Sequence, residues 1–175
     1  MFKQWTIATV CATVLVGVGF TQEARKSPHE TVSVTLSGKN ISISYGRPYL
    51  HGRKAIGGSL VPYGEVWRTG ADEATKLTTD ADLIIGNLKV PKGSYALFTV
   101  PGKDHWSLVV NKTANQWGAF KYDESQDLGR TELKVQPLSS PVEQFTIELT
   151  KKSENQATLT LSWENTKAST TIRSM

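Results

Sequence analysis

The sequence predicts an all-β protein, a single antiparallel β-sandwich of about nine or ten strands that follows an N-terminal signal peptide. Beyond residue 30, apolar and polar residues alternate with a period of two, and turn-forming residues interrupt this alternation at roughly 8–12-residue intervals. Each expected strand therefore has one apolar and one polar face, which favours antiparallel pairing over a parallel sheet covered by helices. No segment has the periodicity of a convincing amphipathic helix.

The first 24 residues have the pattern of a secretory signal peptide. Lys3 supplies a positive charge, and residues 5–20 contain no charged side chain. That uncharged run is shorter than the roughly 20 residues of a membrane-spanning helix, although an uncleaved anchor is the alternative. We therefore predict a signal peptide over residues 1–24, a β-sandwich domain over residues 28–173, and a periplasmic or secreted location.

Composition limits the class of protein further. Cys11 is the single cysteine and lies in the apolar run, so removal of the signal would leave a domain held together by its core alone. The formal net charge is +4 and the pI is about 9.2, but basic and acidic residues are interspersed. This charge pattern argues against nucleic acid as a partner, and nothing beyond the signal segment indicates a membrane.

The individual strands follow from the alternation. Val32 to Leu36 and Ile41 to Tyr45 are separated by a Ser-Gly-Lys-Asn turn and predict a hairpin. Residues 111–130 lack alternation and are expected to form a loop with a short helical turn. Further strands are expected at 83–85, 88–90, 95–100, 106–110, 133–135, 145–149, 157–163 and 168–172.

Residues 44–75 are the first candidate site, because they combine three arginines and a tryptophan with several turn clusters. Residues 66–73 resemble a strand, which would place Arg68 and Asp72 on one face but about 13 Å apart. Each would then need a partner from elsewhere in the chain. The arginines form either a salt-bridge network that fixes the loop or a cleft that binds an anionic or polar group.

A second candidate cluster lies at residues 115–123. The aromatic rings of Trp117, Phe120 and Tyr122 stand beside the polar groups of Asn115 and Asp123. Apolar ring faces next to hydrogen-bonding groups suit carbohydrate recognition. The same residues could instead close one end of the sandwich.

Evidence for catalysis is limited to one histidine. His29, His51 and His105 have no metal-ligand spacing, so neither a metal site nor a cofactor is predicted. His51 lies among the arginines and is the candidate acid or base, with Asp72 or Glu73 as its partner. This pairing defines an alternative function as a hydrolase or lyase, and a purely structural envelope protein is a third interpretation.

Several segments resemble the bacterial domain of unknown function 2911 family over about residues 28–172. They are SYGRPYLHGRK, LVPYGEVWRTGADEAT, VPKGSYALFTVPG, NQWGAF and LSWENTKASTTI. The resemblance implies an extracytoplasmic β domain, with no assigned reaction, substrate or cofactor. Two departures are visible: Asp72 stands where the family pattern usually has Asn, and Gly57 stands where it tends to have Phe.

Together these patterns favour a binding module over an enzyme. The arginines would bind a polar, anionic or carbohydrate-like ligand, aromatic rings would stack on it, and Asp72 and Glu73 would orient the arginines. Neither the identity of the ligand nor the oligomeric state follows from the sequence. The predicted ligand-binding residues are Arg47, Arg53, Arg68, Asp72, Trp117 and Tyr122.

Overall fold

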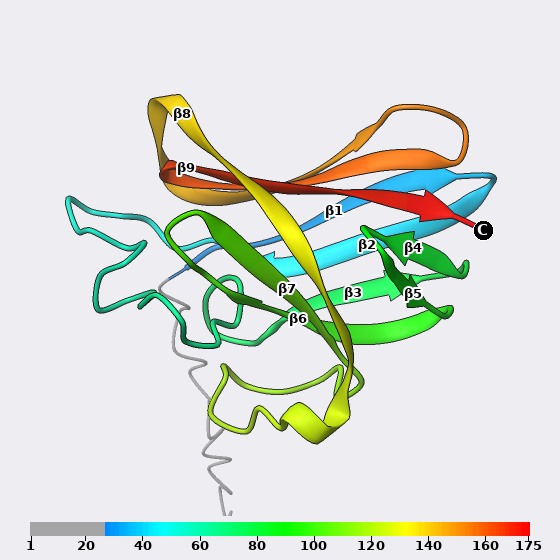
Figure 1. The fold of residues 1–175 in the computed structure, drawn as a ribbon, viewed down its shortest axis with the longest axis horizontal. Helices are drawn as coiled ribbons and strands as arrows, with labels where there is room; N and C mark the ends of the chain where they lie inside the picture. The colour runs from blue at the N-terminus through cyan, green and yellow to red at the C-terminus, as the bar shows by residue number, and fades with distance from the viewer. Residues whose placement is uncertain (1–26) are drawn as a thin grey trace, which may run out of the picture.

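The computed structural model describes residues 27–175, so the predicted signal peptide and Cys11 lie outside the described residues. Within this part of the chain, nine strands form one antiparallel sheet (Figure 1). The all-β prediction is confirmed. No helix between residues 27 and 175 has the length and hydropathy needed to cross a membrane.

The strand bounds agree with the predicted alternation at most positions. The strands are β1 (His29–Leu36), β2 (Lys39–Gly46), β3 (Thr75–Thr79), β4 (Leu83–Ile85), β5 (Leu88–Val90), β6 (Gly93–Val100), β7 (His105–Asn111), β8 (Asp127–Lys151) and β9 (Gln156–Ser174). Their order in the sheet is β1-β2-β3-β6-β7-β8-β9-β4-β5. The loop expected over residues 111–130 contains one 3₁₀ turn, η1 (Glu124–Gln126).

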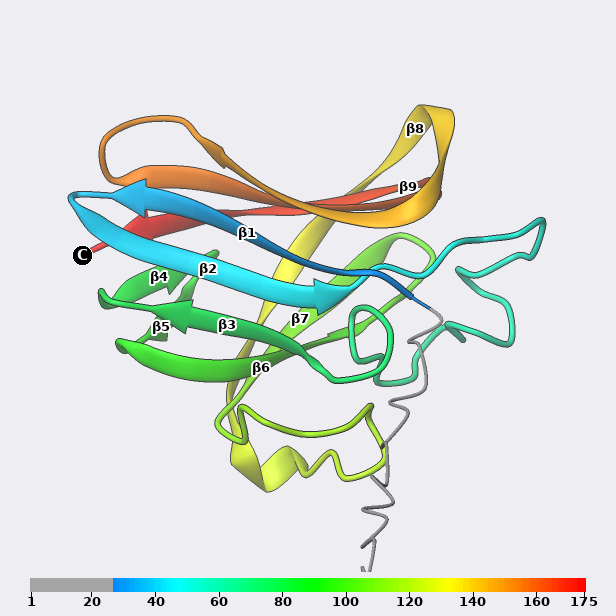
Figure 2. The ribbon, with the colours of Figure 1, turned by 180° about the vertical axis from the view of Figure 1, so that it is seen from behind.

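The sheet is strongly curved and encloses the main core. Figures 1 and 2 show part of β8 together with β9 lying over the strands from β2 to β6. Alternate residues of each strand point into this space, as Ile41, Ile43 and Tyr45 of β2 do. A smaller cluster that includes Ala96 and Phe98 lies on the opposite face of β6, where the loop after β7 packs against it through Tyr122.

Two long strands replace four of the expected short ones. The predicted strands at 133–135 and 145–149 are parts of β8, and those at 157–163 and 168–172 are parts of β9. The β8–β9 register shifts between Pro137 and Val142 and again between Val142 and Thr146. These bulges accommodate the proline-containing stretch without ending the strand.

The long connection between β2 and β3 (residues 47–74) contains the clearest correction. Residues 66–73 were expected to be strand-like, but Thr69 and Asp72 have left-handed φ angles of 58° and 63°. They turn the chain, so Nη1 of Arg68 donates a hydrogen bond to the backbone oxygen of Asp72 at 3.3 Å. The expected separation of about 13 Å, which an extended strand would impose, is therefore wrong.

The same connection is fastened to β8. The backbone N–H of Phe145 donates to the Pro48 oxygen at 2.9 Å, and that of Leu50 donates to the Glu143 oxygen at 3.0 Å. These bonds pair the segment that directly follows β2 with β8, although the sheet is not closed. Residues 47–50 are therefore fixed in position by backbone bonds at one end of the fold.

Candidate functional site

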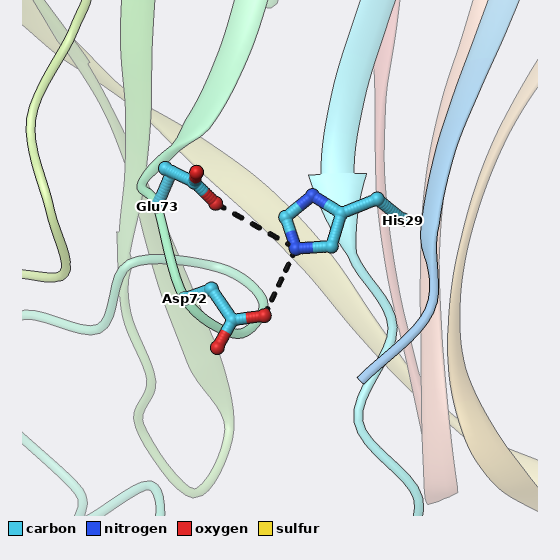
Figure 3. Close-up of side chains that lie close together, drawn as sticks. All are labelled: His29, Asp72 and Glu73. Carbon is cyan, nitrogen blue, oxygen red and sulfur yellow. Dashed lines mark hydrogen bonds and ion pairs between the residues drawn. The ribbon is translucent and has the colours of Figure 1, made fainter. Parts of the chain in front are cut away.

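Three polar side chains from distant parts of the sequence meet near the start of β1. Nε2 of His29 lies 2.9 Å from Oδ2 of Asp72 and 3.6 Å from Oε2 of Glu73 (Figure 3). Their side chains are 28%, 22% and 41% exposed respectively, so the cluster is half-buried and open to solvent on one side. One imidazole nitrogen thus faces two carboxylates.

Backbone pairing explains why these residues meet. His29 is the register partner of Gly46 in the β1–β2 ladder. On the other side of Gly46, the Ala71 N–H donates to the Gly46 oxygen at 3.3 Å, which places Asp72 next to the ladder. A Cβ atom at Gly46 would lie only 2.3 Å from the Ala71 oxygen, so only glycine allows this close approach.

The cluster stands at the rim of a pocket of about 440 Å³, which we call the Trp117 pocket. It is lined by residues of β1, of the adjoining ends of β2 and β3, and of the loop after β7. Ligand pockets of proteins commonly have volumes of roughly 300–1,000 Å³. The polar and aromatic lining residues include His29, Ser44, Glu73, Lys76, Asn115 and Trp117.

Trp117 has an exposed ring on a fixed backbone. The residue is 57% exposed, whereas Trp67, Trp106 and Trp163 are buried in the core. Trp117 forms an isolated antiparallel bridge with Glu73, and the adjacent Gly118 N–H donates to the Asp72 oxygen at 2.9 Å. The ring and the carboxylates are therefore held by the same short ladder.

Polar side chains surround this ring. Nζ of Lys76 donates to Oδ1 of Asn115 at 2.9 Å, which joins β3 to the loop after β7. Gln116 donates through Nε2 to the Thr113 oxygen at 2.9 Å and so stiffens that loop. The wall of the pocket consequently presents a cation, amides and a carboxylate beside an apolar ring face.

The three predicted arginines do not converge on one ligand position. Arg47 pairs with Glu30 at 2.6 Å and donates to Thr146 of β8 at 2.9 Å. Arg53 donates to the backbone oxygens of Tyr49 and Leu50, both at 2.9 Å. Arg53 and Arg68 line a separate pocket of about 430 Å³, but they donate hydrogen bonds to backbone oxygens of the β2–β3 connection itself.

The structure places His29, rather than His51, beside Asp72 and Glu73. The His51 ring packs near the Tyr49 ring with centroids 5.4 Å apart, and its backbone N–H donates to Oε1 of Glu143 at 2.8 Å. His51 lines the pocket that contains the two arginines. His29 is not among the residues that the sequence predicts for the site, although its place opposite Gly46 follows from extending the hairpin register back from the turn at residues 37–40.

Tyr122 stands apart from the Trp117 pocket and has structural partners. Its hydroxyl donates to Oδ2 of Asp127 at 2.6 Å and accepts from Nη2 of Arg130 at 2.8 Å. Its ring packs against Phe98 with centroids 5.1 Å apart. Burial and the hydrogen bond to Asp127 raise the pKa of Tyr122 to about 12.

These features define a class of protein: an all-β domain with an open, mixed polar and aromatic pocket at one end of its curved sheet. The chain belongs to the family described as "Protein of unknown function (DUF2911)", whose model matches residues 27–172. This match confirms the family resemblance found in the sequence. No curated protein and no solved structure matches the chain.

Proposed function

We propose that this protein is an exported, periplasmic or secreted module that binds a saccharide in the Trp117 pocket. The observation that carries the proposal is the exposed aromatic residue Trp117, which is 57% accessible and stands on a backbone fixed by pairing with Glu73 and Asp72. Export rests on the charge and hydropathy pattern of residues 1–24.

A saccharide fits this pocket chemically. Its ring presents an apolar C–H face that can stack on the indole, while its hydroxyl edge needs hydrogen-bond donors and acceptors. Lys76 and Asn115 offer donors, and Glu73 offers an acceptor on the same wall. The volume of about 440 Å³ lies within the usual range of small-molecule pockets.

An arginine clamp for an anion receives less support from the geometry. Arg53 and Arg68 donate hydrogen bonds to backbone oxygens of the β2–β3 connection. Arg47 pairs with Glu30 and donates to Thr146. Bidentate binding of an anion would have to break several of these bonds. The saccharide proposal leaves all of them intact.

The test is a glycan array screened with the full-length chain, followed by calorimetric titration of the best glycan. Trp117→Ala should weaken binding by about tenfold or more, because a central stacking residue commonly contributes over 1 kcal/mol. Phe120→Ala is the matched control, since Phe120 is 83% exposed and lies outside this pocket. Equal affinity of wild type and Trp117→Ala, or no glycan bound by wild type, contradicts the proposal.

A further inference from the structure

We propose that His29, Asp72 and Glu73 bind a divalent first-row transition-metal ion, such as Zn²⁺ or Mn²⁺, at the rim of the Trp117 pocket. One ligand atom from each residue lies within 4.8 Å of the other two. Figure 3 shows both carboxylates directed at the same ring nitrogen. One imidazole nitrogen and two carboxylate oxygens form a donor set that these ions accept.

The separations between the ligand atoms suit a shared ion. Two atoms that each lie about 2.1 Å from a metal are about 3.0 Å apart at a right angle and about 3.4 Å apart at a tetrahedral angle. Nε2 of His29 lies 2.9 Å from Asp72 Oδ2 and 3.6 Å from Glu73 Oε2. The two carboxylate oxygens also lie within 4.8 Å of each other, and rotation of the two carboxylate side chains would adjust this separation to that of two ligands of one ion.

The chemistry of the imidazole nitrogen favours a cation over an ordinary ion pair. Nε2 carries at most one hydrogen, so it cannot donate a strong, linear hydrogen bond to two carboxylates at once. Two carboxylates gathered on one nitrogen also repel each other. A divalent ion in the position of that hydrogen interacts favourably with all three ligands.

His105 provides an internal comparison. Its Nδ1 lies 2.8 Å from Oε1 of Glu132, and both side chains are largely exposed, at 78% and 68%. This pair has one carboxylate on one nitrogen, which a single N–H satisfies. Among residues 27–175, one group of three His, Asp or Glu side chains lies close enough together to hold a metal ion, and it is the group at His29.

The surrounding backbone holds the ligands in place while leaving room for others. His29 is fixed by the β1–β2 ladder, and Asp72 and Glu73 are fixed by their backbone pairing with Gly118 and Trp117. His29 and Glu73 also line the Trp117 pocket, so the open side of the ion would face that pocket. Three protein ligands with open positions are typical of metal sites that also bind a second molecule.

This position explains why spacing along the chain gave no metal signal. The ligands come from residue 29 and residues 72–73, which only the hairpin register and the turn at Asp72 bring together. The inference concerns the metal alone and does not depend on saccharide binding. It can therefore fail or succeed separately from the proposed function.

The experiment titrates the full-length chain, purified without a polyhistidine tag, with ZnCl₂ and separately with MnCl₂ by calorimetry, in the absence of any sugar. Wild type should bind one ion, and Zn²⁺ should bind more tightly than Mn²⁺. Asp72→Asn and Glu73→Gln keep the side-chain shape and should each weaken Zn²⁺ binding by about tenfold or more. His29→Ala should abolish it.

His105→Ala is the matched control and should leave Zn²⁺ affinity unchanged, as should Trp117→Ala. Circular dichroism of each variant establishes that it is folded. Unchanged Zn²⁺ affinity in both Asp72→Asn and Glu73→Gln, or loss of the same binding in His105→Ala, overturns the proposal. Zn²⁺ binding by Trp117→Ala without sugar binding would support the metal site and the saccharide site as two separate properties.

Discussion

Gly46 is the residue that allows the site to exist. It separates His29, its partner in the β1–β2 ladder, from Ala71, which donates to its backbone oxygen at 3.3 Å. A side chain at this position would project into the Ala71 carbonyl, 2.3 Å from the built Cβ. Because backbone cannot move aside as a flexible side chain does, the whole turn that carries Asp72 would have to shift.

We therefore expect Gly46→Ala to damage both stability and the site. The overlap should lower the free energy of unfolding by about 1–3 kcal/mol, and displacement of Asp72 should weaken Zn²⁺ binding. Urea denaturation and zinc calorimetry measure the two effects. Gly52→Ala is the control, because nothing lies within 4 Å of its built Cβ and its positive φ predicts a stability cost of about 1 kcal/mol with unchanged metal affinity. Wild-type zinc affinity in Gly46→Ala would contradict this account.

The sequence predicts some residues of the candidate site but not all of them. Asp72, Glu73 and Trp117 were singled out for their charge and aromatic character, and they surround one pocket or its rim. His29 is not predicted, because neither its residue type nor its neighbours in sequence indicate a binding role. Its role depends on register, a long-range property that residue type does not encode.

At the scale of elements, threonine explains one missed strand. Strand β3 reads Thr-Lys-Leu-Thr-Thr, and its buried positions are Thr75, Leu77 and Thr79. Counted as polar, these threonines hide the alternation, although β-branched side chains suit strands well. Thr69 has the opposite problem, because a buried threonine with a φ of 58° violates the usual preference of β-branched residues.

Side-chain hydrogen bonds explain how Thr69 keeps that conformation. Its hydroxyl donates to Oγ1 of Thr99 at 3.2 Å, and its backbone oxygen accepts from Oγ1 of Thr75 at 2.6 Å. These partners are 30 and 6 residues away in sequence. Local propensity could therefore not have predicted the turn, and with it the position of Asp72.

The β2–β3 connection also depends on one carboxylate of β9. Oε1 and Oε2 of Glu164 accept hydrogen bonds from the backbone N–H groups of Ala55 and Ile56 at 2.9 and 2.7 Å. Both of these residues are buried. Without the carboxylate, two backbone donors would lose their partners, which destabilises the attachment of this segment to the sheet.

Glu164→Ala should therefore loosen the connection. We expect the free energy of unfolding to fall by about 1–3 kcal/mol, and trypsin to cleave faster after Arg53 and Lys54, which directly precede Ala55. Limited proteolysis with mass spectrometry and urea denaturation measure these effects. Glu148→Ala, an exposed change on β8, is the control and should alter neither. Wild-type cleavage rates in Glu164→Ala would show that the carboxylate does not hold this segment.

At the scale of the whole molecule, a cluster of aromatic rings and a tyrosine hydroxyl connect β2 and the β2–β3 connection to β8 and β9. Trp67 of the β2–β3 connection stacks on Trp163 of β9 with centroids 5.8 Å apart and meets Phe145 of β8 at 5.0 Å. Tyr45 of β2 packs edge-on against Phe145 at 5.7 Å. Its hydroxyl accepts from the Ile147 N–H at 2.9 Å, so β2 and β8 are joined across the core.

This central tyrosine predicts a loss of stability at alkaline pH. Burial is the main cause that raises the pKa of Tyr45 to about 12, whereas an unfolded tyrosine has a pKa of about 10. The unfolded state therefore releases this proton first, so the stabilisation is complete below about pH 10 and on the order of 2 kcal/mol of it is lost by about pH 12. Urea denaturation at rising pH should show this decline.

Tyr45→Phe should be less stable at neutral pH, because the Ile147 N–H loses its acceptor, yet its stability should fall less steeply between about pH 10 and 12. Tyr122, whose pKa is also raised to about 12, and Tyr95, whose pKa is raised by burial, should contribute to the remaining decline. The exposed Tyr63→Phe control should keep the wild-type slope, and an equal slope in Tyr45→Phe would show that Tyr45 does not couple folding to alkaline pH.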